Sequence, residues 1–139
     1  MSEDSRRRLQ EHTWHDAKLI ELKIAGSTGI VDDVELLIDR PVAGAAGRSQ
    51  RVIVKLLGCR VLRVDIDLLG KRFCADDIQS VSLELDGGAG EHLRSRSRQT
   101  FDLPDTRLPL DSLGYVRVVL IPPGGQIEAL VRDVEYLEA

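Results

Sequence analysis

The sequence predicts a mainly β protein, a single-domain antiparallel β-sandwich or partly open barrel of about seven strands with little helix. Two observations carry this prediction. Large apolar residues occupy every second position along several stretches, and Gly- or Pro-containing segments separate those stretches. Successive side chains of a strand point to opposite faces, so this pattern builds a sheet with one buried face and one wet face. The alternating residues are Ile20, Leu22, Ile24, Val34, Leu36, Ile38, Val52, Val54, Leu56, Leu62, Val64, Ile66 and Leu68.

The first predicted element is a hairpin. A strand from Ala17 to Ala25 is followed by the turn residues Gly26 to Gly29 and by a second strand from Val31 to Ile38. A loop of small residues, Val42 to Gln50, then leads to the next strand. Gly and Ser supply the backbone freedom that such turns need.

The stretch from Arg51 to Leu69 keeps one inward parity, except at Gly58 and Arg60. It is either one long strand bent at Gly58 or two shorter strands that meet at a tight turn there. We favour the bent strand, because a single glycine without Asn, Asp or Pro beside it is a poor hairpin signal.

The middle of the chain is the least regular part of the sequence. A helical turn is expected between Phe73 and Ser80, through Ala75 to Asp77, and a strand over Val81 to Leu85. The segment from Ala89 to Leu113 is predicted to be a long surface loop with one short strand, Gln99 to Leu103. Long loops in compact domains are often functional, so this segment is one place to look for a binding surface.

The last third predicts the clearest hairpin. Tyr115 to Ile121 is rich in β-branched residues, Pro122 to Gly125 is a turn, and Gln126 to Leu137 returns. The apolar parity of the returning strand changes near Arg132 and Asp133, which predicts a β-bulge there.

Composition indicates an ordinary globular protein. The chain has 139 residues, a net charge of −4 and a charged fraction of 30%, which fits one domain with one core. We expect a flexible segment at 1–12 and a single β domain at 13–139. Met1 to Gln10 has no apolar stretch behind its arginines, and no apolar run is long enough to cross a membrane, so a cytoplasmic location is predicted.

The possible interaction or site residues are Trp14, His15, Asp16, Arg94, Arg96 and Arg98. Arg94, Arg96 and Arg98 alternate with serines and could touch phosphates, but no aromatic residue lies among them, so nucleic acid is not the expected partner. Cys59 and Cys74 sit in apolar surroundings and are predicted to be buried thiols.

Histidines provide the remaining candidate chemistry. His12 and His15 could meet on a helical turn and hold a metal ion with a remote ligand such as Asp65. In the alternative, structural interpretation, Trp14 caps the open end of the sheet, and His15 and Asp16 form hydrogen bonds with the backbone. His92, in the predicted loop, is expected to be solvent-exposed without a catalytic role.

The segment Thr13-Trp14-His15-Asp16-Ala17-Lys18-Leu19 resembles the opening of a group of small bacterial β-rich proteins of unassigned function. Further short matches to this group are 33–36, 58–62, 69–71 and 77–78. The resemblance covers about half of the chain in short pieces. It implies a β-rich single domain and no particular activity.

The function predicted from the sequence is that of a non-enzymatic protein-binding module, which contacts another protein or a second copy of itself. Small β-rich immunity proteins that neutralise toxins offer an analogy for such a role. The alternative is a small metal-dependent or hydrolytic enzyme that uses the region of His12, His15 and Asp16. No cofactor is implied, because the Gly-rich pieces at 44–47 and 87–90 lack the spacing and the following helix of a nucleotide cradle.

Overall fold

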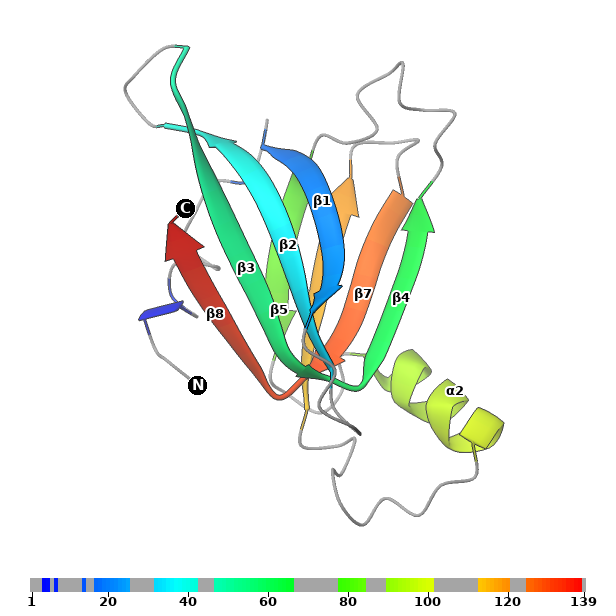
Figure 1. The fold of residues 1–139 in the computed structure, drawn as a ribbon. Coiled ribbons are helices and arrows are strands. Elements are labelled where there is room, and N and C mark those ends of the chain that lie inside the picture. Colours follow the sequence, from blue (N-terminus) through cyan, green and yellow to red (C-terminus); the bar gives the residue numbers. More distant parts are fainter. Residues whose placement is uncertain are drawn as a thin grey trace.

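The computed structural model describes residues 4, 5, 7, 14, 17–25, 32–42, 47–66, 78–84, 90–101, 113–120 and 125–138. They form two antiparallel sheets of four strands each, with one helix on the outside (Figure 1). The elements are β1 (Lys18–Ala25), β2 (Asp32–Pro41), β3 (Ser49–Cys59), β4 (Val61–Ile66), β5 (Ile78–Glu84), α2 (Glu91–Phe101), β6 (Gly114–Leu120), β7 (Gly125–Val131) and β8 (Asp133–Glu138). The predicted mainly β sandwich is confirmed.

The first sheet has the strand order β1-β2-β3-β8, and the second has the order β4-β7-β6-β5. The predicted hairpins are confirmed, because β1 pairs with β2 and β6 pairs with β7 in antiparallel register. The strand predicted over Val81 to Leu85 is confirmed as β5. Ala75 to Asp77 of the predicted helical turn lie outside the described residues, whereas Ile78 to Ser80 belong to β5.

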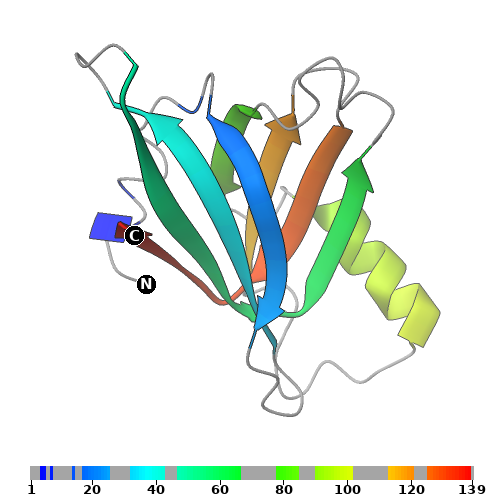
Figure 2. The ribbon, with the colours of Figure 1, turned by 45° about the horizontal axis from the view of Figure 1, so that its top comes forward.

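Two strands pass from one sheet to the other at a shared corner (Figures 1 and 2). The chain leaves β3 at Cys59 and enters β4 of the second sheet at Val61, and it leaves β7 for β8 of the first sheet at Arg132. Backbone hydrogen bonds tie the crossings together, from Arg60 N to the carbonyl oxygen of Leu130 at 2.9 Å and from Arg132 N to the carbonyl oxygen of Leu57 at 3.0 Å.

The corner refines two of the predictions. The stretch around Gly58 does not fold back as a hairpin, because β3 and β4 belong to different sheets. Gly58 has a φ of 61° at this bend, a conformation that favours glycine, and its N–H donates to Asp33 Oδ1 at 3.0 Å. At Arg132 the prediction of a bulge within one strand is wrong. The residues that face the core are odd-numbered in β7 and even-numbered in β8, so the parity changes across the break between these two strands.

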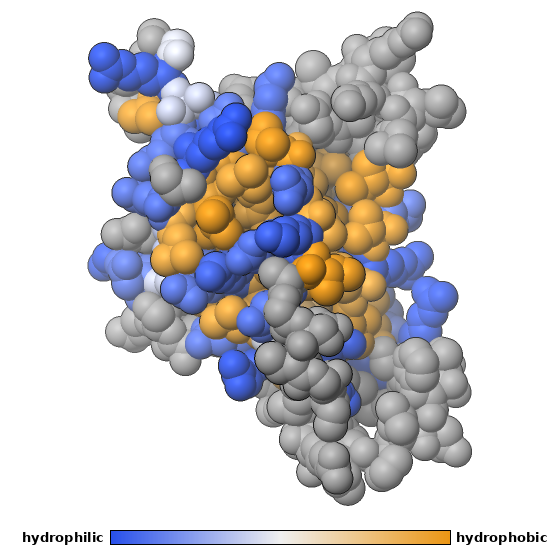
Figure 3. Space-filling view, in the orientation of Figure 1, coloured by the Kyte–Doolittle hydropathy of each residue, from blue (hydrophilic) through white to orange (hydrophobic). Residues whose placement is uncertain are grey.

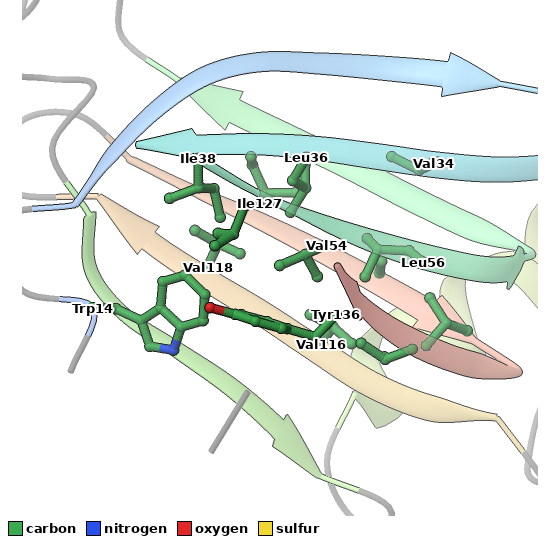
Figure 4. Packing of buried hydrophobic residues seen from close by; sticks show 14 of the residues in the cluster. Trp14, Val34, Leu36, Ile38, Val54, Leu56, Val116, Val118, Ile127 and Tyr136 are labelled. Atoms are coloured by element: carbon green, nitrogen blue, oxygen red, sulfur yellow. The ribbon is translucent and has the colours of Figure 1, made fainter. Parts of the chain in front are cut away.

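The core fills the space between the two sheets (Figure 4). Its side chains come from alternate positions of β2, β3 and β8 in the first sheet and of β6 and β7 in the second. The buried residues of this cluster are Trp14, Ala17, Val34, Leu36, Ile38, Val52, Val54, Leu56, Cys59, Val116, Val118, Leu120, Ile127, Ala129, Val131, Val134 and Tyr136. Cys59 is buried, as predicted, and its Sγ donates to the carbonyl oxygen of Val61 at 3.3 Å, whereas Cys74 lies outside the described residues.

The segment predicted to be a surface loop with a short strand contains an α-helix, Glu91–Phe101, so the prediction is wrong for these residues, whereas residues 102–112 lie outside the described part of the chain. Arg, Gln, Glu and Leu are good helix formers, and the interleaved serines, which suggested a loop, are only mildly unfavourable. The helix docks on the outer face of the second sheet through a small cluster of Leu93, Leu113, Tyr115 and Leu130, with Val61 packed against it.

Gly90 allows this docking. It has a φ of 79°, and a Cβ atom there would lie 2.7 Å from the ring of Tyr115. Its carbonyl oxygen accepts the first backbone hydrogen bonds of the helix, from Leu93 N and Arg94 N.

Within the described residues, no helix is both long and apolar enough to cross a lipid bilayer.

Candidate functional site

Trp14, the one described residue of the Trp-His-Asp segment, is part of the core. Its indole is buried and lies edge-on to the ring of Tyr136, with ring centroids 6.3 Å apart (Figure 4). This placement agrees with the structural interpretation of Trp14. His12, His15 and Asp16 lie outside the described residues, so the metal-site alternative built on them stays a prediction.

Two of the three arginines predicted as a possible interaction cluster, Arg94 and Arg96, have described side chains, and these lie in different environments. Arg94 is fully buried, and its Nη2 donates to the carbonyl oxygen of Leu113 at 2.8 Å, so it holds α2 on the sheet. Arg96 is exposed on the helix. The side chain of Arg98 lies outside the description, although its backbone belongs to α2.

A buried carboxylate lies on the outer face of the second sheet, beside α2. Glu128 of β7 is 3% exposed. Its Oε1 accepts a hydrogen bond from the hydroxyl of Tyr115 at 2.5 Å and lies 2.6 Å from Nε2 of His92. The rings of His92 and Tyr115 meet edge-on, with centroids 5.8 Å apart. The site therefore joins α2 to two neighbouring strands through one carboxylate oxygen.

The charge of Glu128 is stabilised within this cluster. Burial alone would raise the pKa of Glu128, but the hydrogen bonds from Tyr115 and His92 and the charges of His92 and Arg63 outweigh it, so that the pKa lies below its ordinary value of 4.5. Register explains part of this balance. Glu128 stands directly opposite Arg63 of β4 on one side and Arg117 of β6 on the other.

The cluster orients a histidine and fastens a helix. A carboxylate bound to one ring nitrogen fixes the tautomer and the orientation of an imidazole, and the His92 side chain is 54% exposed. Sequence reasoning missed this site because His92 was placed in a loop and compared only with nearby residues. The sequence of the β6–β7 hairpin does contain a signal for this site, because the register of the hairpin places Tyr115 diagonally across from Glu128.

A second feature is an exposed apolar region where the sandwich opens between β1 and β4, which we call the open side. Leu22 and Ile24 of β1 pair with the buried Leu36 and Val34, so they point toward the interior. Ile24 is nevertheless 62% exposed.

The same holds on β4, at the other margin of the open side. Val64 pairs with the buried Ile127 but is 47% exposed. Ile20 of β1 is 45% exposed. Figure 3 shows apolar surface over β1 and between β1 and β4. Within the described residues, β1 pairs with β2 and β4 with β7, and each has no strand on its other side. Among the described strands, the outer edges of β1 and β4 therefore have no neighbouring strand and lie beside exposed apolar side chains.

The outer face of the first sheet carries charges of alternating sign across its four strands. In the register of the sheet, Lys23 of β1 faces Glu35, Glu35 faces Lys55, and Lys55 faces Glu135. Lys55 Nζ lies 3.7 Å from Glu35 Oε1. Opposite charges on neighbouring strands favour this register. The row reaches the free edge of β1 at Lys23.

Comparison with protein-family models, with curated proteins and with solved structures finds no match for this chain. The resemblance of the Trp-His-Asp segment therefore stays a prediction. Among the described residues there is no group of three or more His, Cys, Asp or Glu side chains that could hold a metal ion.

Proposed function

We propose that this protein is a non-enzymatic protein-interaction module and that it binds an extended polypeptide segment at the open side. The observation that carries the proposal is the exposure of interior-facing apolar residues on two edge strands, above all Ile24 and Val64. An added strand would receive backbone hydrogen bonds from an edge and would cover these side chains.

The edges support this function because their interior-facing positions carry neither a proline nor a charged residue. Edge strands in natural proteins are commonly protected by prolines or by charged residues that point inward. Neither β1 nor β4 contains a proline, and the interior-facing positions of both strands are aliphatic. A bulge between Leu19 and Glu21 leaves a regular edge over the rest of β1.

The proposal is tested by site-specific photo-crosslinking in the native host. A photo-reactive residue is placed at Ile24 or at Val64 and, as a matched control, at Arg51, which is exposed on β3 away from the open side. We expect discrete crosslinked protein species from Ile24 and Val64, at a yield about tenfold above that from Arg51.

A charged substitution gives an independent arm of the same test. Ile24→Lys should abolish the crosslinks from Val64 without lowering the thermal stability, because the side chain of Ile24 is already mostly in water. Crosslinks from Val64 that persist unchanged in Ile24→Lys, or equal yields at Ile24, Val64 and Arg51, would overturn the proposal.

A further inference from the structure

The sequence of β1 is self-complementary when the strand is read against itself in the antiparallel direction. Glu21 and Lys23 precede and follow Leu22 in the strand, and their exposed side chains lie on the outer face of the sheet. Ile20 and Ile24 are the next residues along the strand in each direction, and both are exposed. An antiparallel pair centred on Leu22 places Glu21 opposite Lys23 within the regular part of β1, and Ile20 of the bulge lies beyond this pair.

We propose that the partner bound at β1 is a second copy of this chain, in an isologous dimer that joins the two β1 edges antiparallel about Leu22. This inference rests on the proposed function and names the occupant of one margin of the open side. The two first sheets then form one continuous eight-stranded sheet, counted as two copies of a four-stranded sheet. A two-fold axis of this kind makes each unlike-charge pair occur twice.

Neighbouring registers lack this complementarity. Interior-facing side chains stay on the interior face only when the register shifts by an even number of residues. The adjacent shift in one direction sets Glu21 against Glu21 of the other copy, and the shift in the opposite direction sets Lys23 against Lys23. Like charges directly opposite each other destabilise a strand pair. Of these three registers, the one centred on Leu22 alone pairs unlike charges.

The same register continues the pattern of the whole sheet. The charge row that runs through Glu135, Lys55, Glu35 and Lys23 would be extended by Glu21 of the other copy, which keeps the alternation of sign. On the interior face, the row of Tyr136, Val54, Leu36 and Leu22 would be extended by Leu22 of the other copy. A second copy of β1 in this register would therefore continue both the charge row and the apolar row of the first sheet.

The β4 edge provides a matched comparison. Arg63 and Asp65 flank Val64 and would also pair with unlike charges about that residue. We favour β1 because it exposes two large apolar side chains, Ile20 and Ile24, whereas β4 exposes one.

The test is a charge-swap experiment read by analytical ultracentrifugation. Glu21→Lys and Lys23→Glu each set like charges opposite one another at two symmetric places, so each should weaken the dimer about tenfold. The double variant restores unlike pairs and should dimerise within about twofold of the wild type. Asp65→Arg, the matched reversal on β4, should leave the dimer constant unchanged.

The outcomes separate this inference from the proposed function. Rescue by the double variant, with each single variant weakened and all variants unfolding at the wild-type temperature, supports the dimer. A chain that stays monomeric up to about 1 mM, single variants that dimerise as the wild type does, or a dimer weakened by Asp65→Arg alone would overturn it. Photo-crosslinks from Ile24 to a different protein would leave the proposed function standing while removing this occupant.

Discussion

Removal of one hydroxyl tests whether the Glu128 cluster holds α2 to the sheet. Tyr115→Phe deletes the donor that lies 2.5 Å from Glu128 Oε1, and the carboxylate it leaves is 3% exposed. A hydrogen bond to a charged group contributes about 1.5 to 3 kcal/mol. At this chain length, a loss of about 2 kcal/mol lowers Tm by roughly 6 to 10 °C. Urea unfolding at neutral pH measures the loss directly.

Tyr136→Phe is the matched control, because Tyr136 is buried to the same degree and also loses only a hydroxyl. That hydroxyl accepts a hydrogen bond from Arg40 Nη1 at 3.2 Å, in a part-buried setting. The long distance predicts a smaller cost, about 1 kcal/mol. Far-UV circular dichroism shows whether the helix signal is lost in Tyr115→Phe and kept in Tyr136→Phe.

The cost of Tyr115→Phe should depend on pH in one direction. The pKa of Glu128 in the folded protein lies below its ordinary value of 4.5, so its contribution to stability is complete above 4.5. That contribution is lost as the pH falls through the folded-state pKa. The difference between Tyr115→Phe and wild type should therefore shrink well below pH 4.5, while that of Tyr136→Phe stays constant. Equal costs for the two variants at neutral pH would refute the reasoning.

Two further substitutions test the packing. Trp14→Ala empties a buried site in the core and should lower the free energy of unfolding by about 3 to 5 kcal/mol, measured by chemical denaturation. A decrease below about 1 kcal/mol would show that Trp14 does not close the core. Gly125→Ala combines a φ of 100° with a Cβ that would collide with the carbonyl oxygen of Asp65, and should cost about 3 kcal/mol. Gly47→Ala, with a φ of 79° but open space around it, should cost about 1 kcal/mol, and equal costs would contradict the collision.

Alternation of apolar residues was sufficient to predict the sandwich. Val34, Leu36 and Ile38 take the interior face of β2 as the pattern requires, because a strand has one side chain direction per position. The pattern could not say that a strand changes sheets. β3 and β4 keep one inward parity across their change of sheet, whereas β7 and β8 do not, so the parity alone does not reveal where a strand changes sheets.

The helix and its cluster were harder to predict. α2 has few apolar residues, and it is held by Leu93 and by the buried guanidinium of Arg94, a type of contact that no hydrophobic period reveals. The contact between His92 and Glu128 spans 36 positions in the chain. It depends on where the helix docks, and the sequence contains no local signal for that. The exposure of Ile24 was equally hidden, because the alternation predicts which way a side chain points but not whether another layer covers it.

The corner at which β3 continues into β4 and β7 continues into β8 has a mechanical consequence. Because the same two chain segments belong to both layers, and Arg60 and Arg132 tie them by backbone hydrogen bonds, neither layer can melt while the other stays whole. Amide protons near the corner should exchange with solvent only through global opening, and those of β1 should exchange sooner through fraying. The strand at which a second copy is proposed to attach is thus an edge strand that can open without breaking the corner.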